Sequence, residues 1–191
     1  METTAERLGI LAVGLTMMGI GASPYPLLLI LCYGIHELGH IVASRLCKAK
    51  IRKIKAGVFH LSMSYDCQGL TYKKEILVLF GGIIFNLVSA FLVYILPIPK
   101  TEAKEFFIVA SVSLALMNLY PVSVLDGGGI LRAVLLMTVR YDIAEKISRT
   151  LYFIFALILW FVASYFLLVF SGSLSLFLIS VLLLMKLCLT F

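Results

Sequence analysis

The chain has 191 residues, of which 62% are hydrophobic and only 14% are charged. A soluble domain is roughly half apolar and a quarter charged, and the mean hydropathy of +1.08 lies far from that balance. The composition therefore excludes an ordinary soluble globular protein. The length predicts a single domain, residues 1–191, and at roughly 20 apolar residues per span it has room for about six membrane helices.

The net charge is +6, from 16 Lys and Arg against 10 Asp and Glu. The basic residues lie between apolar stretches, which favours membrane topology over nucleic-acid binding. The N-terminal residues lack the basic region and cleavage site of a secretory signal, so we expect the first apolar stretch to stay in the mature protein. The cysteines are scattered without CxxC spacing and indicate apolar packing, not disulfides; they are Cys32, Cys47, Cys67 and Cys188.

Six apolar stretches follow one another along the chain. They cover residues 8–22, 26–46, 76–96, 106–119, 151–170 and 174 to the end. The fourth runs into a break rich in Pro and Gly, after which a helical pattern continues from Gly129 to Met137. The hydrocarbon core of a bilayer has no water to bond the backbone, and a helix satisfies its backbone hydrogen bonds internally. The pattern therefore predicts an all-α membrane protein with six transmembrane helices.

The basic residues also predict the orientation of these helices. With the N-terminus in the cytosol, 13 of the 16 Lys and Arg lie in cytosolic loops, Lys100 and Lys104 lie outside, and Lys186 lies near the cytosolic end of the last span. Positive charge concentrates on the cytosolic side of membrane proteins. We therefore expect both termini to be cytosolic.

Residues 51–70, between the second and third stretches, form a segment of a different kind. Its first part alternates polar and apolar residues, and Gly57 and Gly69 interrupt it. This alternation predicts a short β-hairpin at the membrane surface. An irregular basic loop in the cytosol is the alternative.

The second stretch holds three ionisable residues, His36, Glu37 and His40, in the string HELGH. A charge at the bilayer centre costs about 2.5–3.5 kcal/mol on insertion scales, so such residues point to function. On a helix the two histidines share one face, while Glu37 lies about 100° round from His36. Both imidazoles can then bind one metal ion, and the carboxylate can reach a water on that ion. This arrangement is typical of zinc hydrolases.

A catalytic zinc site needs a third protein ligand. Asp126 is favoured because it lies in the break at residues 120–129, where irregular backbone at membrane depth has to line protein or a cavity. His60 and Cys32 are alternatives. The other candidates are Asp66, Glu75, Asp142 and the three remaining thiols.

Three strings then occur in order, each in its own apolar stretch: HELGH at 36–40, GIIFN at 82–86 and NLYPVSVLDGG at 118–128. The last fits the pattern N-x-x-P-x-x-x-L-D-G at every fixed position. Because of these three strings, the chain resembles the site-2 protease family of intramembrane zinc metalloproteases over residues Leu31 to Arg132. The middle string departs from the family pattern G-P-x-x-N, because Ile83 stands where proline is usual.

The resemblance implies roles for individual residues. It implies zinc held by His36, His40 and Asp126, with Glu37 as general base. It also implies that Asn86 and Asn118 bind the backbone of the substrate, although hydrogen bonds that pack helices together are an equal alternative. The hairpin would then present a strand edge to an extended substrate.

The absence of a PDZ insertion and the position of HELGH in the second of six spans look most like the sporulation-type branch of the family. Members of that branch cleave a membrane-associated pro-sigma factor and usually add a C-terminal CBS domain. The chain ends at Phe191 without one, so it is either a piece of a longer protein or a minimal homologue. The expected function is hydrolysis of peptide bonds near the cytosolic face of a bacterial plasma membrane. The expected partners are the lipid bilayer, a membrane-associated protein substrate and a regulatory membrane protein, but no nucleic acid. A catalytically silent member and a metal-binding or transport protein are the alternatives.

Overall fold

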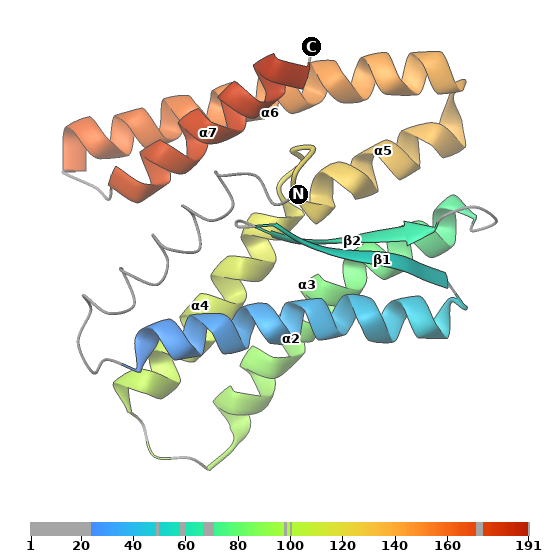
Figure 1. Ribbon diagram of the computed structural model, residues 1–191. Helices are drawn as coiled ribbons and strands as arrows, with labels where there is room; N and C mark the ends of the chain where they lie inside the picture. Colours follow the sequence, from blue (N-terminus) through green and yellow to red (C-terminus); the bar gives the residue numbers. More distant parts are fainter. Residues whose placement is uncertain are drawn as a thin grey trace. The chain divides into compact units, whose positions relative to one another are not determined.

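The computed structural model describes residues 24–48, 50–57, 60–66, 71–97, 99, 101–170 and 174–190. This part of the chain is mainly helical (Figure 1). Its elements are α2 (Tyr25–Leu46), β1 (Lys50–Gly57), β2 (His60–Asp66), α3 (Tyr72–Ile95), α4 (Glu102–Leu119), α5 (Asp126–Thr138), α6 (Tyr141–Phe170) and α7 (Leu174–Thr190). The first predicted stretch, residues 8–22, lies outside the described residues.

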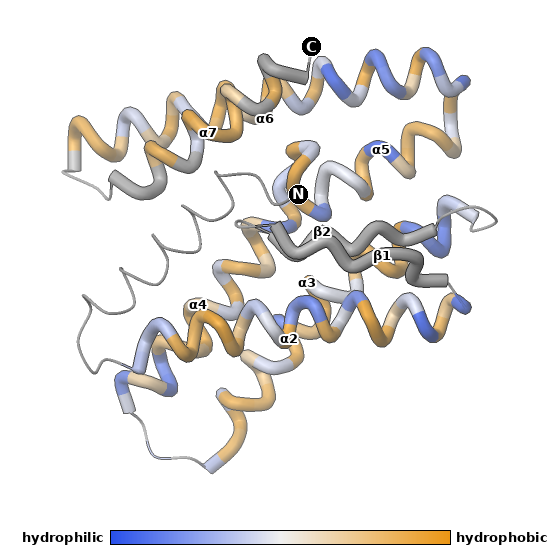
Figure 2. The backbone as a smooth tube through the Cα atoms, in the orientation of Figure 1, coloured by the Kyte–Doolittle hydropathy of each residue, from blue (hydrophilic) through white to orange (hydrophobic). Residues whose placement is uncertain are grey.

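Three of the described helices are long and apolar enough to cross a membrane: Tyr25–Leu46, Tyr72–Ile95 and Tyr141–Val169. Figure 2 shows the extended hydrophobic runs of α3 and α6. Helix α4 begins four residues earlier than predicted and takes in Glu102, Lys104 and Glu105. Helix α7 has 17 residues, which at 1.5 Å each span about 26 Å, less than a hydrocarbon core of about 30 Å. A plan of six spans therefore stays a prediction.

Helices α5 and α6 also start earlier than predicted. Helix α6 begins at Tyr141, ten residues before the predicted stretch, because its buried face continues backwards through Ser148 and Ala144. Helix α5 begins at Asp126 instead of Gly129. Its glycines at 127 and 128 lie against main-chain atoms of Leu119 and Val122, where no side chain would fit.

The two strands pair antiparallel, from Lys50 opposite Asp66 to Gly57 opposite His60. The register shifts between Ile51 and Lys53, as in a β-bulge. The strands occupy the segment in which the alternation of residues predicts a hairpin. They follow α2 closely, so the sheet is attached directly to the helix that carries HELGH.

The chain divides into two compact units, residues 1–116 and 117–191. In the first unit, α2 and α3 approach closely through glycines: a Cβ on Gly81 would lie 2.6 Å from the Gly39 carbonyl oxygen and 2.7 Å from Cβ of Ala43. Small residues allow such contact between helices in membranes. The opposite sides of these helices expose large apolar side chains suited to lipid, including Leu27, Leu31, Leu87 and Phe91.

Replacing Gly39 with alanine is expected to destabilise the first unit by about 1–3 kcal/mol, because the added methyl group meets the main chain of Gly81 and Gly82, which cannot move aside. The matched control is Gly34→Ala on the same helix, where a Cβ has no atom within 4 Å. The midpoint of thermal unfolding in detergent should fall for Gly39→Ala alone. Equal midpoints for the two variants would contradict the close approach.

The second unit has its own apolar core, formed by Val122, Tyr152, Ala156 and Leu187. The Tyr152 hydroxyl donates to the Gly128 carbonyl oxygen at 2.8 Å. Arg132 donates from Nε to Glu145 at 2.6 Å. Both bonds join α5 to α6, so the first turn of α5, which begins with Asp126, is held in a defined orientation.

Candidate metal centre

Helix α2 places His36 and His40 on the same buried face, with exposed fractions of 2% and 5%. Their Nε2 atoms lie 3.2 Å apart, and the rings meet edge to face with centroids separated by 4.7 Å. The spacing of four residues predicts this shared face. The two nitrogens that can bind a metal therefore converge on one point.

The ring of His40 is fixed by the main chain of α3. Its Nδ1 lies 2.9 Å from the carbonyl oxygen of Val78. A carbonyl oxygen only accepts hydrogen bonds, so Nδ1 carries the proton and donates it. The lone pair of the neutral ring is then on Nε2, the nitrogen that faces His36, which is the orientation a metal ligand needs.

Gly82 on α3 provides the space for both rings. A Cβ at this position would lie 2.5 Å from Nε2 of His40, 2.7 Å from Cε1 of His36 and 2.8 Å from Nδ1 of His36. Any side chain there would occupy the volume of the imidazoles. The string GIIFN thus contributes a glycine to the candidate centre, a role that the residue pattern alone does not predict for Gly82.

Asn86 lies one turn after Gly82 and is completely buried. Its Nδ2 is 3.4 Å from Nδ1 of His36. The structure therefore brings Asn86 together with the two histidines. Glu37, next to His36 in the chain, is half-buried.

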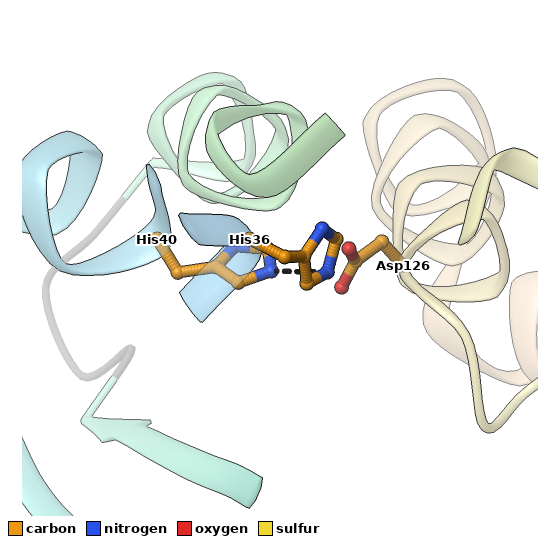
Figure 3. Close-up of side chains that lie close together, drawn as sticks. All are labelled: His36, His40 and Asp126. Atoms are coloured by element: carbon orange, nitrogen blue, oxygen red, sulfur yellow. Dashed lines mark hydrogen bonds between the residues drawn. The ribbon is translucent and has the colours of Figure 1, made fainter. Parts of the chain in front are cut away.

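Asp126 and Asn118 belong to the second unit. Asp126 is the first residue of α5, where the helix dipole stabilises a carboxylate, and the extended backbone of Leu125 precedes it. Asn118 lies near the end of α4 and is half-buried. Figure 3 draws Asp126 with the two histidines, whose imidazoles are joined by the dashed line.

Two of the other ligand candidates, Cys32 and Asp142, have simpler explanations. Cys32 is buried, and its sulfur accepts a hydrogen bond of 3.2 Å from the Ser111 hydroxyl, so it packs α2 against α4. Asp142 is exposed in the first turn of α6. For His60 and Asp66 the structure describes the backbone but not the side chains, so their role as ligands stays a prediction. The Val78 carbonyl could not have been found from the sequence, because any residue at position 78 would supply it.

The family model described as Peptidase family M50 matches residues 100–162, a range that includes Asp126. A solved structure, the site-2 protease from Methanocaldococcus jannaschii, superposes with a TM-score of 0.63 at 22% sequence identity. The alignment covers 94% of this chain and 84% of that chain.

The chain has a site-2 protease fold. The family match over residues 100–162 and the shared fold both agree with the resemblance to the site-2 protease family. A comparison with curated proteins gives no match. The resemblance found in the sequence is thus supported at the level of the family, while the sporulation-type branch stays a prediction.

Proposed function

We propose that this protein is an intramembrane zinc metalloprotease, which hydrolyses peptide bonds of membrane or membrane-associated proteins. The observation that carries the proposal is the pair of buried imidazoles on an apolar helix, with Nε2 atoms 3.2 Å apart. A hydrogen bond from His40 to a main-chain carbonyl orients its lone pair towards the same point. Helix packing alone does not require two histidines in this arrangement.

The proposed ligands are His36, His40 and Asp126, a set of two imidazoles and one carboxylate that suits catalytic zinc. Zinc, when bound, supplies the Lewis acid that polarises the scissile carbonyl. Glu37 takes a proton from the attacking water and returns it to the leaving amine as the carbon–nitrogen bond breaks. These steps need a carboxylate beside the histidines, which the string HELGH provides.

The finer parts of the proposal concern topology and substrate. Six spans with both termini in the cytosol place HELGH near the cytosolic face of a bacterial plasma membrane, and the basic loops support this orientation. The sheet of β1 and β2 has the strand edges needed to bind an extended substrate at the membrane surface. A pro-sigma factor or a similar signalling precursor, bound in part by Asn118, is the proposed substrate. A membrane protein that regulates the cleavage is the remaining proposed partner.

The proposal is tested by zinc content and cleavage in wild type and Asp126→Ala. The purified wild type should bind zinc and cut members of a panel of single-span and pro-sigma-like substrates. Asp126→Ala should weaken zinc binding by more than about 100-fold, the upper end of the loss caused by removing an outer-shell partner. Asp142→Ala, an exposed carboxylate at another helix start, is the matched control and should behave as wild type.

Two results would count against this assignment. A wild type that binds zinc but cuts no substrate in the panel would favour a catalytically silent protein. An Asp126→Ala variant that keeps its zinc would move the third ligand to His60 or Cys32. The position of the cut is a further check, because a product severed in the outer leaflet contradicts the topology.

A further inference from the structure

Asn86 has a buried side-chain amide whose oxygen accepts no hydrogen bond from the described residues. The side chain is completely buried on α3, and Nδ2 lies 3.4 Å from Nδ1 of His36. Within the described part of the chain, Oδ1 of Asn86 has no hydrogen-bonding partner. A buried carbonyl oxygen without a partner costs free energy, so its presence at this position needs a reason.

The chemistry of a histidine ligand supplies that reason. A neutral imidazole carries one proton, so a ring that binds a metal through Nε2 holds its proton on Nδ1. In a buried site this N–H needs an acceptor, which fixes the tautomer and the orientation of the ring. His40 has such an acceptor in the Val78 carbonyl. The Asn86 amide lies beside the corresponding nitrogen of His36.

We propose that Asn86 is a positioning residue for His36. A half-turn of the amide about its Cβ–Cγ bond exchanges Nδ2 and Oδ1, after which Oδ1 accepts the proton of Nδ1. Nε2 of His36 is then left with its lone pair directed at the point that Nε2 of His40 also faces. The inference rests on the proposed metal centre and gives Asn86 a role other than binding the substrate backbone.

The surroundings of Asn86 favour this role. Its side chain has no exposed surface, so a substrate could reach the amide only after the helices separate. The nearby Ser89 hydroxyl donates to the main-chain oxygen of Asn86 and not to its side-chain amide. Gly82, one turn earlier, keeps the space beside both rings clear.

Zinc affinity in detergent-solubilised full-length protein, measured by competition with a chelator, tests the proposal. Asn86→Leu keeps the size of the side chain and removes the acceptor, so affinity should fall about 10–100-fold. Asn86→Asp keeps an acceptor oxygen and should recover most of this loss. Ser111→Ala, which removes a buried hydroxyl bonded to Cys32, is the control and should match wild type.

A second measurement needs no variant and no activity. Nitrogen NMR of histidine-labelled wild type, loaded with zinc, should show His36 with its proton on Nδ1. A proton on Nε2, with zinc bound through Nδ1, would overturn the inference, as would Asn86→Leu binding zinc as tightly as wild type. Equal losses in the folded Asp and Leu variants would also overturn it. A wild type without zinc affinity would instead overturn the proposed function.

Discussion

Replacing Glu37 with glutamine is expected to abolish proteolysis while leaving zinc bound. Glutamine has the size of glutamate but cannot take a proton from water. The cleavage rate should therefore fall by about 10²–10⁴-fold, which is the typical contribution of a general base. Zinc should stay because both imidazoles and their anchor at Val78 are unchanged. The measurements are the single-turnover cleavage rate and the zinc content of the same preparation.

The control for this variant is Glu105→Gln, which changes an exposed carboxylate in the first turn of α4. It should cut at the wild-type rate. A Glu37→Gln variant that cuts equally well would remove Glu37 from the mechanism. Zinc transport across vesicle membranes that survives in Glu37→Gln would favour the transport alternative, because passage of a metal needs ligands and no general base.

Replacing Gly82 with alanine is expected to remove zinc binding without unfolding the protein. The added methyl group would lie 2.5 Å from Nε2 of His40 and 2.7 Å from Cε1 of His36, so both rings must turn away from their common point. The loss of affinity should exceed the roughly 100-fold caused by removing an outer-shell partner, because the ligands themselves move. Since side-chain tips can shift more easily than main chain, the thermal midpoint should change less than in Gly39→Ala.

Gly34→Ala again provides the comparison, since a methyl group at that position meets no atom within 4 Å. It should keep full zinc affinity. If Gly82→Ala binds zinc as tightly as Gly34→Ala, the space beside the imidazoles is not limiting. If Gly82→Ala fails to fold, the glycine serves the contact between α2 and α3 instead of the metal centre.

The apolar stretches predicted most of the described helices because stretches such as the second and the third fill a helix almost completely. The second stretch, residues 26–46, differs from α2 by one residue. The prediction of where α6 begins was wrong, because its first ten residues are mostly polar or charged and only Ala144 and Ser148 continue the buried face. Hydropathy alone does not register such a narrow face.

Within the candidate site, the shared face of the two histidines was predictable from the sequence. The spacing of His36 and His40 predicts a shared helix face, and the structure places both rings there. The contributions of Val78 and Gly82 could not be predicted in the same way. One is a main-chain atom and the other is the absence of a side chain, and both depend on how closely α3 approaches α2.

The hydrogen bond from His40 to Val78 also determines what mutagenesis can detect. The acceptor belongs to the peptide unit, so alanine, leucine or serine at position 78 would still present it to the ring. A side-chain scan of α3 would therefore report Asn86 and Gly82 but pass over the anchor of His40. One histidine of the pair thus depends on the helical backbone, which substitution preserves, and the other on a single amide that substitution can remove.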